Sequence, residues 1–178
     1  MVYNSKIKVG ISHGDVNGIG YEVIIKTLMD PYILEMCTPI VYGSPKVAAY
    51  HRKVLNIETM SFNHVRNAQE ASPNKANIIN CIDENIRVEL GKSTPSAGES
   101  SFLALEKAAS DLQKGLIDVL ITAPIDKHNI QSDQFKFPGH TDYLTRFFNA
   151  DDSVMLMVSE NLKVGVVTGH IPLSDVAR

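Results

Sequence analysis

Residues able to bind ligands or move protons stand where several runs of β-branched, apolar residues end. Four such runs pass into turns rich in glycine, proline, serine, threonine, aspartate and histidine: GIS-HGDVNGIG, VYG-SPK, LIT-APIDK and VVT-GHIP. If these runs are strands of an open α/β sheet, ligands bind beyond their carboxyl ends, where loops and helix N-termini converge. Turn residues also end strands that bind nothing. Polar side chains at four ends favour one shared binding cleft.

The first of these turns lacks the glycine spacing of the common phosphate-binding motifs. Gly14, Gly18 and Gly20 match neither GxGxxG nor GxxxxGK[ST]. These glycines still permit close approach of a ligand to the backbone, and a following helix would point its N-terminal amides at an anion. Asp15 could orient a hydroxyl or amine of a substrate, or could instead cap a backbone amide in a tight turn.

Two further turns carry a lysine and a histidine–threonine pair. Lys127 stands four residues beyond Ala123, at the end of an apolar run. It could bind a carboxylate or phosphate, act as an acid or base if its pKa falls, or be a solvated loop lysine. In FPGHTDYL, His140 and Thr141 begin a helix-like pattern. They could cap that helix, or together hold a substrate with an imidazole and a hydroxyl.

No compact metal motif is present. The chain has no HxH, HExxH or CxxC spacing. A metal site would therefore need ligands scattered over several loops. Cys37 and Cys81 lie in or beside apolar stretches, and we expect both to be free thiols. The histidines are His13, His51, His64, His128, His140 and His170.

Composition excludes several classes of protein. The 178 residues are 44% hydrophobic and 21% charged, which is typical of one globular core. A net charge of -3, with no clustered basic segment, argues against a nucleic-acid partner. The apolar runs are too short to span a bilayer, and the N-terminus has no signal-peptide pattern. We therefore expect a cytoplasmic protein that does not bind membranes.

Hydrophobic periodicity predicts alternating strands and helices. Expected strands lie at 6–12, 39–44 and 116–124, with short strands in ETMSFNHV, ANIINCI and NIRVEL. Expected helices are YEVIIKTLMD, KVAAYHRKVL, SAGESSFLALEKAASDLQKG and TDYLTRFF. The two apolar runs of SVMLMVSENLKVGVVTGH are too close for a crossover helix and should pair antiparallel. The predicted fold is α/β, with flanking helices on a mixed sheet.

Five segments in a fixed order resemble one enzyme family. They are GISHGDVNGIGYEVIIK, SAGESSFLALEKA, DVLITAPIDK, FPGHTDYL and VVTGHIPLSDV. Together they are similar to the 4-hydroxythreonine-4-phosphate dehydrogenases of pyridoxal phosphate biosynthesis, from about Lys6 to Arg178. The interval from His140 to His170 also looks like that of the family.

The resemblance implies a fold similar to the isocitrate/isopropylmalate dehydrogenases, with two lobes and a homodimer. Residues 1–178 would form the N-terminal part, truncated before the NAD-binding part and inactive alone. The implied reaction is oxidation of 4-phosphohydroxy-L-threonine by NAD or NADP, followed by decarboxylation to 3-amino-2-oxopropyl phosphate. The implied divalent metal is zinc, with magnesium or cobalt as alternatives.

The resemblance also implies roles for single residues. His140 and Thr141 would bind the substrate, and His170 would be the first of three metal-binding histidines. From their places in the loops, and not from the resemblance, Asp15 is a further candidate substrate contact and Lys127 the candidate catalytic acid, base or anion contact. NAD-binding residues are not assigned within this chain.

The first motif departs from the commoner family pattern, which leaves the substrate open. Ser12, His13, Val16, Asn17 and Tyr21 are the differing residues. A related dehydrogenase of erythronate or threonate phosphate is therefore an alternative. Two other hypotheses are a phosphate-handling, acyltransferase-like domain that binds acyl phosphate or coenzyme A, and a non-enzymatic domain for binding or assembly.

Overall fold

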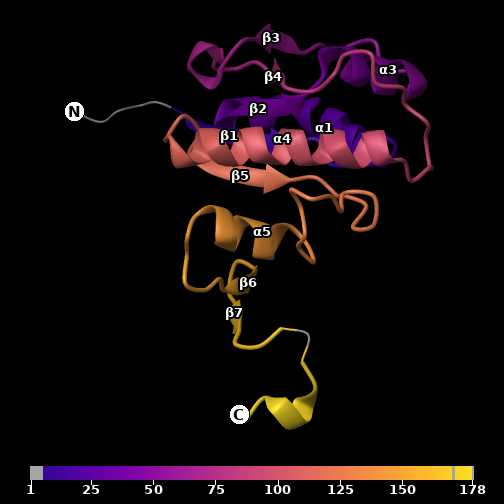
Figure 1. Cartoon of the computed structure of the whole chain (residues 1–178). Coiled ribbons are helices and arrows are strands. Elements are labelled where there is room, and N and C mark those ends of the chain that lie inside the picture. Colours follow the sequence, from indigo (N-terminus) through magenta and orange to yellow (C-terminus); the bar gives the residue numbers. More distant parts are fainter. Residues whose placement is uncertain (1–5, 170, 178) are drawn as a thin grey trace.

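The computed structural model of the chain describes residues 6–169 and 171–177. At its centre is a parallel sheet with the strand order β3-β4-β2-β1-β5 (Figure 1). The strands are β1 Ile7–Ser12, β2 Cys37–Gly43, β3 Asn63–Val65, β4 Asn77–Asn80 and β5 Val119–Thr122. The helices are α1 Gly20–Leu28, α2 Pro31–Met36, α3 Pro45–Val54, α4 Pro95–Gln113 and α5 His140–Phe147. The predicted α/β class with flanking helices is confirmed.

The helices cover both faces of the sheet. Helix α4 contacts β1, β2 and β5, whereas α1 packs against α3. The chain passes from β1 to β2 in one direction along the sheet and from β4 to β5 in the other. Right-handed crossovers then place the connecting helices on opposite faces, and Figure 1 shows α4 in front of the strands.

Helix α4 is the longest helix, and its sequence explains both its ends. The Thr94 hydroxyl accepts a hydrogen bond from the Ala97 amide, and Pro95 takes the first helical position. Gly115, with a φ of 67°, follows its last turn. Small buried residues, among them Ala104 and Ala108, let it lie close to the strands. Neither α4 nor another described helix has the combined length and hydrophobicity that a bilayer span needs.

One predicted strand is wrong, because its backbone donors bind elsewhere. Residues 85–90 of NIRVEL form no strand. The amide of Glu89 donates to Asn17 Oδ1 at 2.7 Å, and the amide of Gly91 donates to the Asn17 carbonyl at 2.8 Å. The segment therefore follows the β1–α1 loop instead of a neighbouring strand.

Strand β5 is partly exposed, although its β-branched residues are typical of a buried strand. It pairs only with β1 and forms one edge of the sheet. Its side chains alternate between exposed and half-buried, and Ile121 is 52% exposed. Its β-branched composition reflects the pleated geometry of a strand, which edge and central strands share.

The predicted antiparallel pair exists but does not join the main sheet. Strands β6 Met155–Val158 and β7 Lys163–Val166 form a separate two-stranded sheet. The loop after β5 and helix α5 lead the chain away from the sheet edge (Figure 1). The five-stranded sheet is therefore wholly parallel, and the expected mixed sheet is replaced by two sheets of different kinds.

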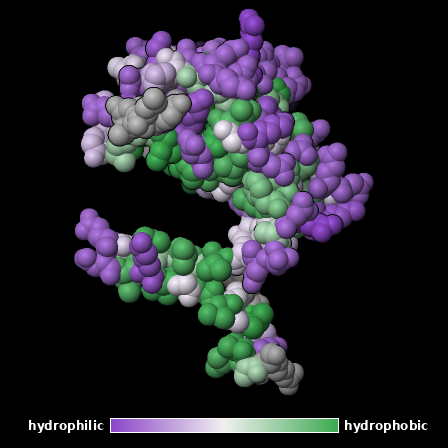
Figure 2. Space-filling model, turned by 90° about the vertical axis from the view of Figure 1, so that its left-hand side faces the viewer, coloured by the Kyte–Doolittle hydropathy of each residue, from purple (hydrophilic) through white to green (hydrophobic). Residues whose placement is uncertain are grey.

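The hairpin β6–β7 is unusually apolar for an exposed element. Val154, Leu156 and Val158 are 60–70% exposed, and Met155 and Met157 on the other face of the strand are more than half exposed. In Figure 2 the C-terminal part forms an arm that projects from the body and carries apolar surface. A lone hairpin is marginally stable in water, so we expect these side chains to be covered by further protein surface.

Candidate functional site

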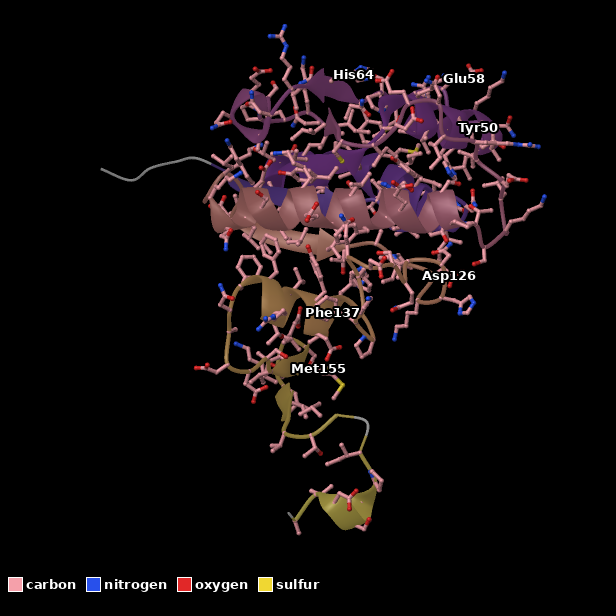
Figure 3. The ribbon with its side chains drawn as sticks, in the orientation of Figure 1. Tyr50, Glu58, His64, Asp126, Phe137 and Met155 are labelled. Carbon is pink, nitrogen blue, oxygen red and sulfur yellow. The ribbon has the colours of Figure 1, made fainter. Side chains whose placement is uncertain are left out.

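The carboxyl ends of β1 and β5 bring two of the predicted loops together. Ser12 and Thr122 are paired across the two strands, so the loops that follow leave the sheet side by side. The Asp15 amide donates to the Pro124 carbonyl at 2.9 Å, which fastens one loop to the other. Figure 3 shows Asp126 on the loop after β5, with Phe137 closer to α5. The expectation that four strand ends share one cleft is met only in part, because the run VVT-GHIP follows β7, which belongs to the separate two-stranded sheet.

Lys127 and His140 meet at the N-terminus of α5. The Lys127 Cε lies 3.6 Å from the position that a Cβ would take on Gly139, the residue before the helix. Burial, and then the positive charge of Lys127, lower the pKa of the His140 imidazole from its ordinary value of 6.5. The imidazole is therefore mainly neutral at pH 7. Its Nε2 is buried and has no partner among the described residues.

Thr141 follows His140 and is exposed at the first turn of α5. A pocket of about 390 Å³ lies beside this turn, lined in part by Thr122, His140, Thr141 and Asp152. No side chain caps the helix, which starts after Gly139. The free amides of this turn and the nearby ammonium of Lys127 both favour an anionic group. Lys127 and His140 therefore lie close together and Thr141 follows His140 in the chain, whereas Lys127 is not among the residues that line this pocket.

Asp15 lies in the same region, but its carboxylate is used within the protein. It is 7% exposed. Its Oδ1 accepts from the Asn17 amide at 2.7 Å, and its Oδ2 accepts from Asn129 Nδ2 at 3.0 Å. The tight-turn alternative for Asp15 is thus the arrangement seen, and neither oxygen points to open solvent. Asn129 is a residue that the sequence analysis did not single out.

His13, which directly follows β1 at the start of the first predicted loop, is fully buried. Its ring stacks on Tyr21, which stacks on His51, with centroid distances of 5.1 Å for each pair. His51 Nε2 bonds the Val16 carbonyl at 2.8 Å, so this stack supports the β1–α1 loop. Burial lowers the pKa of His13 to about 4. A neutral, buried ring fits a structural role.

The predicted metal ligand, His170, lies outside the described residues. Within 6–169 and 171–177, no group of three or more His, Cys, Asp or Glu side chains could hold a metal ion. The described residues therefore do not form a metal site by themselves. Cys37 and Cys81 are free thiols, as expected, and burial raises the pKa of Cys81 to about 12.

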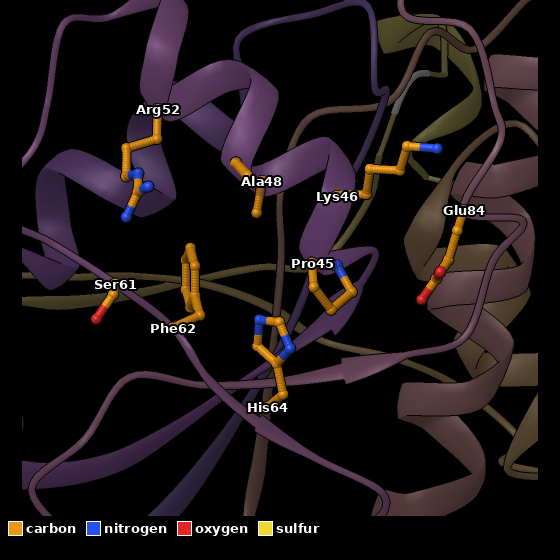
Figure 4. Close-up of a pocket in the computed structure, with 9 residues that line it drawn as sticks. Pro45, Lys46, Ala48, Arg52, Ser61, Phe62, His64 and Glu84 are labelled. Carbon is orange, nitrogen blue, oxygen red and sulfur yellow. The ribbon is translucent and has the colours of Figure 1, made fainter.

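A second groove lies at the opposite edge of the sheet, between α3 and the segment before β3 (Figure 4). Its volume is about 370 Å³, and Lys46, Arg52, His64 and Glu84 are among its polar lining. Lys46 donates to Asn85 Oδ1 at 3.2 Å, and Arg52 donates to the Met60 carbonyl at 2.6 Å. Both cations already donate hydrogen bonds to groups of the protein, and this groove is therefore a weaker candidate for ligand binding than the α5 site.

The fold is an open parallel α/β sheet, and a cation, an imidazole and a hydroxyl lie beyond the carboxyl ends of its strands. This combination is typical of proteins that bind small anionic ligands. Residues 35–178 match the family described as Pyridoxal phosphate biosynthetic protein PdxA. The chain belongs to this family. The resemblance deduced from five short segments is therefore confirmed at the level of the family.

Individual relatives are consistent with this assignment. The chain is 50% identical over 174 residues to a 4-hydroxythreonine-4-phosphate dehydrogenase of Bacteroides thetaiotaomicron, covering 97% of this chain and 48% of that protein. It is 33% identical to a putative D-threonate 4-phosphate dehydrogenase of Oceanobacillus iheyensis, covering 93% and 50%. It thus spans about half the length of the curated relatives it matches.

Solved structures confirm the fold. A crystal structure of a 4-hydroxythreonine-4-phosphate dehydrogenase from Burkholderia phymatum superimposes with a TM-score of 0.85 at 28% identity, covering 97% of this chain and 52% of that one. One from Klebsiella pneumoniae also gives a TM-score of 0.85, at 26% identity, covering 96% and 53%. The fold is therefore of the isocitrate/isopropylmalate dehydrogenase type.

Proposed function

We propose that this protein, at its full natural length, oxidises 4-phosphohydroxy-L-threonine with NAD or NADP, and that the keto acid formed loses CO₂ to give 3-amino-2-oxopropyl phosphate. The name of the relative that shares 50% identity supports this substrate. The structural observation that carries the proposal is the closeness of Lys127 to His140 at the N-terminus of α5, beside the pocket that His140 and Thr141 line.

Each of the three side chains would bind a different group of the substrate. Lys127 is exposed, and its ammonium would hold an anionic group of the substrate, its phosphate or carboxylate. Thr141 would hydrogen-bond a neighbouring polar group. The neutral imidazole of His140 can accept a hydrogen bond, and then the proton, from the hydroxyl that is oxidised. We therefore favour an anion contact for Lys127 over a role as the base.

The proposed reaction balances in two steps. In the first, the carbinol carbon loses a hydride and its hydroxyl loses a proton, which leaves a ketone. A bound nicotinamide would accept the hydride. In the second, the carbon–carbon bond to the carboxylate breaks, CO₂ leaves, and the electron pair is protonated at carbon. The cation of Lys127 beside the substrate would stabilise the negative charge that develops as CO₂ departs.

A divalent metal, zinc above the alternatives magnesium and cobalt, is proposed from the family resemblance. His170 would be one ligand, and the rest of a homodimeric protein would have to supply the others. The described residues do not fit a complete metal site, so no step above is assigned to a metal.

A second substrate has specific support. Two relatives, 33% and 31% identical, carry names for D-threonate 4-phosphate dehydrogenases. D-threonate 4-phosphate also offers a phosphate for Lys127 and a hydroxyl for His140. It lacks the amino group of phosphohydroxythreonine, so the two substrates differ in one charge.

The test is reduction of NAD⁺ and NADP⁺ by the protein of full natural length, with each of the two substrates. We expect turnover with 4-phosphohydroxy-L-threonine and a loss of about 10²-fold or more in kcat/KM for His140→Ala. His64→Ala, which alters an exposed histidine at the opposite edge, is the matched control. A preference for D-threonate 4-phosphate would select the second substrate. Unchanged kinetics of His140→Ala would refute the site.

A further inference from the structure

The loop that carries Lys127 is tied to the β1–α1 loop by one pair of side chains. Asn129, two residues after Lys127, donates through Nδ2 to Asp15 Oδ2 at 3.0 Å. Asp15 is itself fixed, because its Oδ1 accepts from the Asn17 amide and its own amide donates to the Pro124 carbonyl. The pair therefore joins two segments that are far apart in the sequence.

The turn formed by residues 126–129 is anchored at both its ends. At the start, Asp126 Oδ1 accepts from the His128 amide at 2.8 Å. At the end, the Asn129 carbonyl packs so closely on α4 that a Cβ on Gly98 would overlap it. The Asp15–Asn129 hydrogen bond completes this anchoring. Lys127 lies inside the turn and contacts no anchor through its own side chain in the described hydrogen bonds and ion pairs.

We propose that Asp15 and Asn129 are a positioning pair, which holds turn 126–129 so that the Lys127 ammonium stays beside His140. Neither residue touches the substrate. The inference rests on the proposed function only in assuming that Lys127 binds the anionic group of the substrate. It also replaces the predicted role of Asp15, from contact with substrate to support of the residue that makes that contact.

The polarity of the pair makes the inference testable. A carboxylate only accepts hydrogen bonds, so the contact needs the amide of Asn129 as donor. Asn129→Asp alone would set two carboxylates about 3 Å apart and force them to separate or share a proton. Adding Asp15→Asn restores one donor and one acceptor, and the hydrogen bond then runs from the amide at position 15 to the carboxylate at position 129. The amide at position 15 still has an oxygen for the Asn17 N–H.

The experiment compares the full-length protein with the Asn129→Asp, Asp15→Asn and doubly exchanged variants. We expect Asn129→Asp to raise KM for the phosphorylated substrate about tenfold, with a smaller effect on kcat, because ground-state binding of the anion is lost. The double exchange should return KM to within about threefold of the wild type. Asp15→Asn alone should have a small effect on KM, because the side-chain amide of Asn129 can flip and accept a hydrogen bond from the new amide. Asn80→Asp, at an exposed site, is the control.

A second readout does not depend on turnover. Backbone hydrogen exchange of peptides covering residues 126–130 should be faster in Asn129→Asp and return to wild-type rates in the double exchange. Asn129→Ala, which removes the donor without adding charge, gives the same direction if Asn129→Asp does not fold. Failure of the double exchange to restore both KM and hydrogen exchange overturns the inference. If the wild-type protein shows no turnover, only the proposed function is overturned. Hydrogen exchange alone then tests whether Asp15 and Asn129 hold the turn.

Discussion

The buried His13 should make the protein less stable in mild acid. Its side chain is fully buried, and the backbone groups of Ser100 and Gly14 offset only part of the effect of burial on its pKa. Burial lowers its pKa from 6.5 to about 4 in the folded protein. Between these values the unfolded chain binds a proton that the folded protein does not, so the free energy of unfolding falls as the pH falls.

The magnitude follows from the two pKa values. Above pH 6.5 the ring is neutral in both states, and its contribution to stability is complete. From pH 7 to pH 4.5, a shift from 6.5 to about 4 removes about 2 to 3 kcal/mol from the free energy of unfolding. Below about pH 4 the folded state is protonated too, and this loss stops growing.

The assay is urea unfolding of the wild type and of His13→Phe at a series of pH values, followed by circular dichroism. Phenylalanine keeps an aromatic ring against Tyr21 but cannot titrate. Carboxylates and His51 affect both proteins, so the difference between them isolates the His13 ring. We expect the wild type to lose about 2 to 3 kcal/mol more than the variant between pH 7 and pH 4.5. Equal slopes for the two proteins would refute the reasoning.

Three further predictions concern packing and reactivity. Gly98→Ala should lower both stability and substrate affinity, because the new methyl would overlap the Asn129 carbonyl. At Gly91 a new methyl meets no atom within 4 Å, and only the positive φ of this residue disfavours alanine there. The melting temperature and KM of both variants check this. Phe135→Ala should cost about 3 to 5 kcal/mol in urea unfolding, since this fully buried ring stacks on Tyr143 of α5, and a cost below about 1 kcal/mol would contradict that packing. Cys81 should react with a thiol reagent at pH 8 only on unfolding, because burial raises its pKa to about 12; rapid labelling of the native protein, mapped by mass spectrometry, would contradict this.

Local patterns in the sequence were sufficient where local physics decides the structure. Helix α4 combines a threonine cap, a proline in its first turn and a glycine after its end, so its limits could be predicted closely. The Lys127 loop and the His140 helix could be predicted to lie near each other, because both come directly after strand β5 in the chain. These are properties of short segments.

Distant side chains decided the features that the sequence analysis missed. The apolar alternation of NIRVEL is strand-like, but Asn17 accepts hydrogen bonds from the backbone N–H of Glu89 within it and of Gly91 directly after it. The burial of His13, which lies in a loop, depends on Tyr21 of α1 and His51 of α3. The role of Asn129 depends on Asp15, which is 114 positions away. No periodicity within one segment reports such contacts.

The most direct test of the central claim is the affinity of the full-length protein for its phosphorylated substrate with and without the Lys127 charge. Lys127→Met keeps the length of the side chain and removes the ammonium, and Lys136→Met, in the same loop, is the control. We predict that Lys127→Met raises KM for 4-phosphohydroxy-L-threonine by about 10- to 100-fold, whereas Lys136→Met leaves it unchanged. Equal KM values for Lys127→Met and the wild type would contradict the account.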